Sequence, residues 1–316
     1  MSAAEFDLIA RIRARAGQRG GVVLGIGDDA ALLQVPPDRQ LVVTADTLNA
    51  GVHFPDATAP ADIGWKSLAV NLSDLAAMGA VPAWCTLSLS LPQADPSWVD
   101  AFLDGFLDLA DQHAIGLVGG DTTRGPLSIS VTAMGLVESG GALRRDRARV
   151  GDDVWVTGTP GDAAAALEAL QQGREAPKSL RQRLDRPMPR VAAGRRLSGL
   201  AHACIDISDG LLADLTHICE SSGVGAEINL VELPASADLA SVESNRRWGW
   251  QACGGDDYEL CFTASPHNRD LIVQALDFTD VSATRIGRIV SEQGVRAFDA
   301  DAQEWRPPSR GYEHFL

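Results

Sequence analysis

The sequence predicts a protein of mixed α/β or α+β class with two domains. The chain has 316 residues, more than a single hydrophobic core usually supports. Short β-branched runs alternate with amphipathic runs, which predicts strands interspersed with helices. A polar stretch rich in glycine and arginine, residues 138–153, interrupts that alternation. We therefore expect a first domain over residues 1–143 and a second over 144–316.

The first half of the chain is expected to hold helices over 1–16, 60–78 and 97–112, and strands over 22–24, 41–44, 117–118 and 128–137. The helix over 60–78 carries the clearest signals. Pro60 suits a first helical turn, apolar residues recur on one face from Ile63 to Leu75, and Gly79 ends the pattern.

The second half restarts with a strand and continues the alternation. We expect strands over 154–156, 226–231, 258–263 and 283–290, and helices near 162–172, 188–199 and 210–221. The turn from Gly158 to Gly161 leads into an alanine-rich helix, because glycine and proline favour a turn there and alanine favours the helix.

The charge of the chain excludes two classes of partner. There are 27 lysines and arginines against 42 aspartates and glutamates, a net charge of −15. Such a chain repels phosphate backbones and anionic lipids unless its basic residues form a stripe, and the sequence contains no such stripe. We therefore expect neither nucleic acid nor a membrane as a partner.

Cysteine usage and hydropathy predict a cytoplasmic protein. The five cysteines are an odd number without C-x-x-C spacing, which disfavours a disulfide framework and a zinc site. The first sixteen residues mix acids with arginines and lack the apolar stretch of a signal peptide. No apolar run approaches the roughly 18 residues that span a bilayer.

The most informative feature is a set of aspartates beside apolar runs, where an unpaired carboxylate is costly. They are Asp28, Asp29, Asp46, Asp74, Asp121, Asp206 and Asp209, and Arg124 is the one basic residue within three positions of any of them. Each could cap a helix or a turn. Taken together, carboxylates without Cys or His clusters indicate a hard, oxygen-preferring ion such as Mg²⁺.

Other phosphate- and metal-binding motifs do not fit. The segment from Asp206 to Gly210 has glycine at the wrong position for an EF-hand loop. The run Gly25 to Ala30 matches G-x-G-x-x-A, but its two carboxylates would repel a dinucleotide pyrophosphate. No Gly-Lys-Ser/Thr motif and no protein-kinase motif set is present. The arginines between 144 and 149 are either a solvated linker or a clamp on a polyphosphate.

Seven ordered motifs give the chain a family resemblance. They read GIGDDAAL, TADTLNAGVHF, KSLAVNLSDLAAMGA, VGGDTTRGPLSISVTAMG, VTGTPGDAAAAL, IDISDGLLADL and GGDDYELCFT. Together they resemble the thiamine-monophosphate kinase family, which is similar in turn to aminoimidazole ribonucleotide synthetase and selenophosphate synthetase. The resemblance covers nearly the whole chain.

The resemblance implies an enzyme that uses ATP and several Mg²⁺ ions to convert thiamine monophosphate to thiamine diphosphate. It also implies a homodimer whose N-terminal β-sheets pair into a barrel, an α/β second domain, and ATP between the domains. The acceptor is a phosphate monoester that is mostly dianionic near pH 7, so no catalytic general base is required. Alternatives are another ATP-dependent enzyme of the superfamily, or a non-catalytic protein that binds metal or nucleotide.

The resemblance also assigns site residues. The implied metal ligands are Asp29, Thr44, Ala45 (through its carbonyl), Asp46, Asp74, Asp121, Asp206 and Asp209. The implied ATP contacts are Gly120, Asp121, Arg145 and Ser208, and the implied thiamine-phosphate contacts are His53, Asp256 and Tyr312. Three positions depart from the family: Asp256 replaces a glutamate, Tyr312 a tryptophan, and Leu103 a tyrosine found in some members.

Overall fold

The chain forms two compact units, and the computed structural model describes residues 5–17, 19–279, 281–307 and 311–312. The first unit runs up to Gly140 without the short segment Ala76–Gly79, which groups with the second unit from Gly141 onward. The division therefore lies three residues before the position at which the glycine- and arginine-rich stretch led us to expect it.

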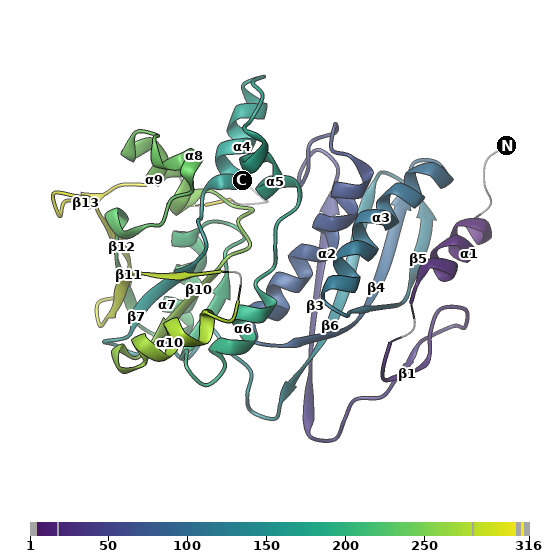
Figure 1. Cartoon of the computed structure of the whole chain (residues 1–316), viewed down its shortest axis with the longest axis horizontal. Coiled ribbons are helices and arrows are strands. Elements are labelled where there is room, and N and C mark those ends of the chain that lie inside the picture. Colours follow the sequence, from purple (N-terminus) through teal and green to yellow (C-terminus); the bar gives the residue numbers. More distant parts are fainter. Residues whose placement is uncertain (1–4, 18, 280, 308–310, 313–316) are drawn as a thin grey trace. The chain divides into compact units, whose positions relative to one another are not determined.

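The first unit is a four-stranded sheet with helices on one face (Figure 1). Its elements are α1 (Glu5–Arg15), β1 (Val22–Leu24), β2 (Leu32–Leu33), β3 (Arg39–Asn49), α2 (Pro60–Ala77), β4 (Val81–Leu91), α3 (Pro96–Gln112), β5 (Gly116–Arg124) and β6 (Ser128–Glu138). The strand order is β3-β6-β4-β5, in which only the β4–β5 pair is parallel, and β1 and β2 form a separate ribbon.

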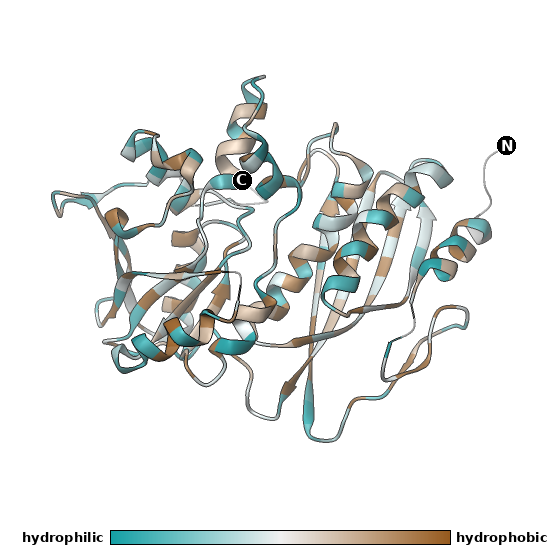
Figure 2. Ribbon diagram, in the orientation of Figure 1, coloured by the Kyte–Doolittle hydropathy of each residue, from teal (hydrophilic) through white to brown (hydrophobic). Residues whose placement is uncertain are grey.

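The two faces of this sheet differ in burial. Along β6, Ile129, Val131 and Ala133 are buried, whereas the alternate residues Ser130 and Thr132 are half-buried. Side chains alternate between faces along a strand, so one face packs against the helices and the other is open. The ribbons of α2 and α3 show hydrophobic and hydrophilic bands, as expected for helices that cover a sheet (Figure 2).

The second unit is built on a seven-stranded sheet of order β13-β12-β9-β11-β7-β10-β8. Its elements are β7 (Asp153–Thr157), α4 (Asp162–Gln171), α5 (Lys178–Asp185), α6 (Val191–Leu197), β8 (Ala203–Asp206), α7 (Leu211–Ser222), β9 (Gly225–Asn229), η1 (Leu230–Glu232), α8 (Ala237–Ala240), α9 (Ser244–Cys253), β10 (Leu260–Ala264), η2 (Pro266–Asn268), α10 (Arg269–Leu276), β11 (Ala283–Val290), β12 (Gly294–Phe298) and β13 (Glu304–Trp305).

Both faces of this second sheet are covered. On one face, Leu211 and Leu215 of α7 join Val154 and Val156 of β7 in a single core cluster. Trp155 points to the opposite face by strand alternation, and its ring stacks on Phe262 of β10 at 6.1 Å between centroids. Burial on both faces explains the short apolar strands of this half of the chain.

Most sequence-predicted elements are confirmed, with shifted ends. The helix predicted over 60–78 is α2, and the strand over 283–290 is β11. The helix expected over 188–199 begins at Val191, and the strand expected over 226–231 ends at Asn229. Strand β4 was not predicted, because Val81 and Thr86 are its sole β-branched residues.

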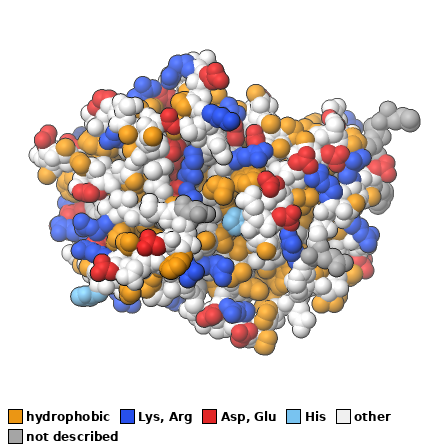
Figure 3. All heavy atoms as spheres, in the orientation of Figure 1, with side chains coloured by type: hydrophobic (Ala, Val, Ile, Leu, Met, Phe, Trp, Pro, Cys, Tyr) orange, Lys and Arg blue, Asp and Glu red, His pale blue; other side chains and the backbone are white. Residues whose placement is uncertain are grey.

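The described part of the chain contains no helix that is long and apolar enough to cross a membrane. On the face drawn in Figure 3, acidic and basic side chains are interspersed rather than gathered into one basic area.

Candidate active site

The sequence-predicted site residues are divided between the two units. Asp29, Thr44, Ala45, Asp46, His53, Asp74, Gly120 and Asp121 belong to the first, and Arg145, Asp206, Ser208, Asp209, Asp256 and Tyr312 belong to the second. Each group is described within its own unit.

In the first unit, strand β3 and helix α2 bring three of the predicted ligands together. Thr44 and Asp46 are two positions apart on β3 and therefore point to the same, helix-covered face. The Thr44 hydroxyl donates a hydrogen bond to the Asp74 carboxylate on α2. Burial, followed by the charge of Asp74 and a hydrogen bond with it, raises the pKa of Asp46 to about 7. Two carboxylates this close favour a shared proton or a bound cation.

Asp121 lies on another strand of the sheet from these three residues. Ala45 stands between Thr44 and Asp46 on β3, and its side chain is exposed on the opposite face of the strand from that of Asp46. The register runs from Asp46 through β6 and β4 to Gly120 on the far edge strand β5. Three strand spacings separate these edges by about 14 Å, so Asp121 cannot ligate the same ion as Asp46 within this unit.

Gly120 cannot be replaced without a change in the backbone. Its φ is +148°, and a Cβ there would lie 1.8 Å from the Leu87 carbonyl oxygen. The next residue, Asp121, is exposed and accepts a hydrogen bond from the Thr122 N–H at 2.9 Å. Asp28 likewise accepts from the Asp29 N–H at 2.8 Å and leaves Asp29 exposed. Local turn bonds therefore account for part of the acidic pattern.

The turn after β3 fixes the tautomer of His53. The Asn49 N–H donates to His53 Nδ1 at 3.0 Å, so the neutral ring carries its proton on Nε2. The Lys66 Nζ donates to the His53 carbonyl oxygen at 3.0 Å, although the Lys66 side chain is buried in α2. The sequence analysis did not assign Lys66 to the site. The one signal that could have indicated it is the rarity of lysine, since the chain has only two.

In the second unit, Asp206 is the last residue of β8, and Ser208 and Asp209 lie in the turn between β8 and α7. The Asp214 carboxylate, in the first turn of α7, accepts from the N–H groups of Ser208, Asp209 and Gly210 at 3.0, 3.1 and 3.2 Å. Burial, together with the charge of Asp209, raises the pKa of Asp214 to about 7, although the N–H donors act in the opposite direction. Asp214 therefore shapes this turn, a role that the sequence analysis missed.

Two other segments meet this turn. The Asp256 N–H donates to the Ser208 carbonyl oxygen at 2.9 Å, and the Tyr312 N–H donates to the Asp209 carbonyl oxygen at 3.1 Å. Ser208, Asp209, Asp256 and Tyr312 thus lie beside one another, although they span more than a hundred residues of sequence. Tyr312 is 48% exposed, which leaves its ring accessible to a ligand.

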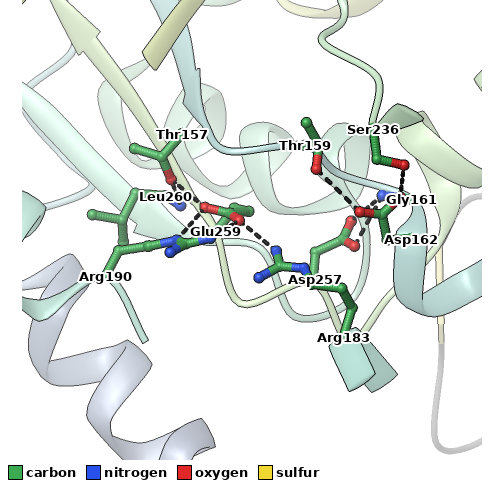
Figure 4. Close-up of polar contacts among 10 residues, drawn as sticks. All are labelled: Thr157, Thr159, Gly161, Asp162, Arg183, Arg190, Ser236, Asp257, Glu259 and Leu260. Atoms are coloured by element: carbon green, nitrogen blue, oxygen red, sulfur yellow. Dashed lines mark hydrogen bonds and ion pairs between the residues drawn. The ribbon is translucent and has the colours of Figure 1, made fainter. Parts of the chain in front are cut away.

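Glu259 anchors the segment that carries Asp256 (Figure 4). Its carboxylate is fully buried and accepts from Arg190 at 2.5 and 2.6 Å, from Arg183 at 2.5 Å and from the Thr157 hydroxyl at 2.7 Å. Burial alone would raise the pKa of Glu259, but the two arginines outweigh it and hold the pKa below its ordinary value. We did not predict this network, because its members are far apart in sequence.

Asp257 is the second anchor of the same segment. Both of its carboxylate oxygens lie 2.9 Å from the backbone nitrogen of Gly161, a residue in the turn after β7 (Figure 4). Burial raises the pKa of Asp257 well above its ordinary value. The pKa of the neighbouring Asp162 is also raised by burial, and its carboxylate accepts from the Ser236 hydroxyl at 2.6 Å and the Thr159 hydroxyl at 3.1 Å.

Two further positions were singled out by the family resemblance. Arg145 is exposed, and its carbonyl oxygen accepts from the Ser222 hydroxyl at 3.0 Å. Leu103 is fully buried in α3. This position therefore packs in the core of the first unit.

The donors fit Mg²⁺ as pairs rather than as a closed cage. Among the residues that the structure describes, no group of three or more His, Cys, Asp or Glu side chains could hold a metal ion by itself. Mg²⁺ usually keeps several waters and takes one or two carboxylates together with substrate phosphates. The adjacent Asp46 and Asp74 suit that mode of binding, whereas Asp206 and Asp209 are three positions apart in sequence.

Comparisons with known proteins identify two similar domains and full-length relatives. Residues 27–137 match the family AIR synthase related protein, N-terminal domain, and residues 149–300 match the corresponding C-terminal domain. The chain is 45% identical to the thiamine-monophosphate kinase of Escherichia coli (strain K12), over 100% of this chain and 99% of that one.

Two solved structures extend the comparison. Thiamine-monophosphate kinase from Stenotrophomonas maltophilia K279a is 58% identical, with a TM-score of 0.88 over 96% of this chain and 99% of that one. AaThiL complexed with AMPPCP and TMP is 33% identical, with a TM-score of 0.78 over 98% of this chain and 96% of that one. The two domain matches and these full-length similarities show that the chain belongs to the thiamine-monophosphate kinase family.

Proposed function

We propose that this chain transfers the γ-phosphoryl group of ATP to thiamine monophosphate and releases ADP and thiamine diphosphate. The observation that carries the proposal is its full-length similarity to thiamine-monophosphate kinases. One of these similar proteins has been solved with an ATP analogue and TMP. The adjacent carboxylates of Asp46 and Asp74 support it, because phosphoryl transfer between two anions needs cations to lower their repulsion.

The metal ligands in this proposal are Asp46, Asp74 and Thr44 in the first unit and Asp206 and Asp209 in the second, with Asp29, Asp121 and the Ala45 carbonyl as further donors. Several bound Mg²⁺ ions would neutralise the phosphates and align them for in-line transfer. Gly120, Asp121, Arg145 and Ser208 are the proposed ATP contacts. No side chain need act as a general base, since the acceptor phosphate is already ionised near pH 7.

The acceptor contacts in this proposal are His53, Asp256 and Tyr312. The His53 tautomer offers an N–H at Nε2, which is a suitable donor to a phosphate oxygen. Tyr312 has an accessible ring and Asp256 an acidic group, which suit the aromatic and cationic parts of a thiamine phosphate.

We further propose a cytoplasmic homodimer that pairs through the open face of the β3-β6-β4-β5 sheet to form a barrel. Leu41 and Val43 on β3 and Val81 on β4 are 43%, 56% and 38% exposed, and exposed apolar side chains on a sheet favour burial against a second copy.

ADP release measured with a coupled assay tests the function. We expect release that requires both thiamine monophosphate and Mg²⁺. ADP release without any acceptor, or a preference for another small phosphate, would overturn the proposal and favour a different ATP-dependent activity.

Chelation is expected to abolish turnover reversibly. EDTA should stop ADP release, Mg²⁺ should restore it, and Zn²⁺ should do so poorly, because the donors are carboxylates and hydroxyls without Cys or His clusters. The measurement is the rate after dialysis into metal-free buffer and readdition of each ion. Full activity in the metal-free buffer would contradict the metal assignment.

His53→Ala and Tyr312→Ala are each expected to raise the KM for thiamine monophosphate while the KM for ATP stays nearly unchanged, because both side chains are assigned to the acceptor. Asp256→Glu, which restores the usual acid, should lower the acceptor KM or leave it unaltered. Phe278→Ala removes another exposed aromatic ring from the second unit and serves as the control. A selective rise in the KM for ATP would show that the two substrates have been assigned to the wrong residues.

A further inference from the structure

The segment that carries Asp256 has an unusual backbone. Asp256 and Tyr258 have φ values of +67° and +51°, in the left-handed region that non-glycine residues rarely adopt. Each such residue costs of order 1 kcal/mol or more and persists only where surrounding contacts enforce it. Two of them on either side of Asp257 indicate that this segment is held in one defined conformation.

Contacts on three sides hold that conformation. The Asp256 and Tyr258 N–H groups donate to the carbonyl oxygens of Ser208 and Ile207, at 2.9 and 2.8 Å. Asp257, which stands between these two residues, has a buried carboxylate that accepts from the Gly161 N–H. The carboxylate of Glu259, one position after Tyr258, is bound by two arginines (Figure 4). The backbone of residues 256–258 is therefore docked on the turn that carries Asp206 and Asp209.

The side chain of Asp256 is fixed by a separate contact. The Tyr258 hydroxyl donates to Asp256 Oδ1 at 3.0 Å. The Tyr258 side chain is 7% exposed, so its ring is held by packing while its hydroxyl reaches the carboxylate. This hydrogen bond brings the two side chains to the same side of the segment. A carboxylate held at one oxygen still has acceptor capacity at the other.

We infer that Tyr258 is a positioning residue that orients the Asp256 carboxylate toward the acceptor substrate. This inference depends on the proposed function. The short aspartate has few rotamers, and the hydroxyl selects one of them, so less conformational entropy is lost when the substrate binds. Tyr258 therefore acts through Asp256 and does not itself touch the substrate.

The test is a double-mutant cycle with steady-state kinetics. Tyr258→Phe removes the hydroxyl alone, and Asp256→Gly removes the carboxylate while tolerating the positive φ. We expect Tyr258→Phe to raise the KM for thiamine monophosphate about three- to tenfold, the size of effect expected from the loss of one typical intramolecular hydrogen bond. The KM for ATP should change less than about twofold. In the Asp256→Gly background, Tyr258→Phe should have no further effect on the acceptor KM.

Asp153→Asn is the matched control. Asp153 is a buried acid with a 2.6 Å ion pair to Arg269, but it lies at the far end of β7 and β10 from Glu259. It should lower thermal stability without changing either KM. Four outcomes would each overturn the inference. Tyr258→Phe could leave the acceptor KM unchanged, raise the KM for ATP in parallel, or fail to fold. It could also have an equal effect on the acceptor KM in the unaltered chain and in Asp256→Gly. If the unaltered chain shows no ADP release that depends on thiamine monophosphate, the proposed function fails and the inference fails with it.

Discussion

Asp74→Asn is expected to reduce turnover at least about a hundredfold, which corresponds to roughly 2.7 kcal/mol of barrier. Asp74 accepts from the Thr44 hydroxyl and lies close enough to Asp46 to raise its pKa, so its charge is part of the proposed cation site. Asparagine keeps the size and one acceptor oxygen but removes the negative charge that would bind Mg²⁺. The measurement is kcat at saturating Mg²⁺ and both substrates.

Thermal unfolding and a surface variant control this experiment. Asp74→Asn should remain folded, because the change relieves repulsion with Asp46 in the absence of metal. Asp104→Asn alters an exposed aspartate on α3 that pairs with Arg15, and it should keep full activity. Retention of more than about a tenth of the turnover by Asp74→Asn would contradict its role as a ligand.

Glu259→Gln is expected to lower the free energy of unfolding by about 3–5 kcal/mol, the usual cost of removing one partner from a buried ion pair. The Glu259 carboxylate is 0% exposed and bound by two arginines whose side chains are 20% and 15% exposed, so glutamine would leave two largely desolvated guanidinium groups without their counter-charge. Chemical denaturation at neutral pH measures the effect.

Glu227→Gln is a closely matched control. Glu227 also binds two arginines, Arg288 and Arg296, but its side chain is 21% exposed and those arginines are 69% and 38% exposed. Solvent screening should limit its loss to about 1 kcal/mol or less. Equal losses in the two variants would show that burial does not determine the strength of the Glu259 network.

The pH dependence of Glu259→Gln follows from the lowered pKa of Glu259. A carboxylate whose pKa is lower in the folded state stabilises the protein above its unfolded pKa of about 4.3 and loses that contribution as the pH falls through the folded pKa. The difference in stability between the unaltered chain and Glu259→Gln should therefore be full near pH 7 and shrink below about pH 4.

The local elements were predictable where the signals were local. Helix α2 was visible from Pro60, its apolar face and Gly79, and β11 from its β-branched run, because capping and periodicity are properties of neighbouring residues. Strand β4 has a weaker signal because Val81 and Thr86 are its only β-branched residues and the alternation of leucine with serine is confined to its second half. Its assignment depends on pairing with β5 and β6, which are distant in sequence.

The candidate site was predictable in composition but not in geometry. Aspartates beside apolar runs and seven ordered motifs indicated the chemistry, since residue type and spacing carry that information. The contacts around those aspartates were not predictable, because Glu259, Arg183 and Thr157 come from separate elements, as do Asp257 and Gly161. Pairings of this kind depend on the packing of the sheet and its helices.

The sequence by itself determined that this protein has two mixed α/β units, an excess of carboxylates without compensating lysines, and the motifs of its family. Only the tertiary structure decided the partner of each carboxylate. Asp46 lies beside Asp74, Asp214 accepts hydrogen bonds from the turn that carries Asp209, and Glu259 is bound by two arginines. The physical reason is that the energy of a charge depends on its burial and on partners within a few ångströms. Spacing along the chain does not specify either quantity.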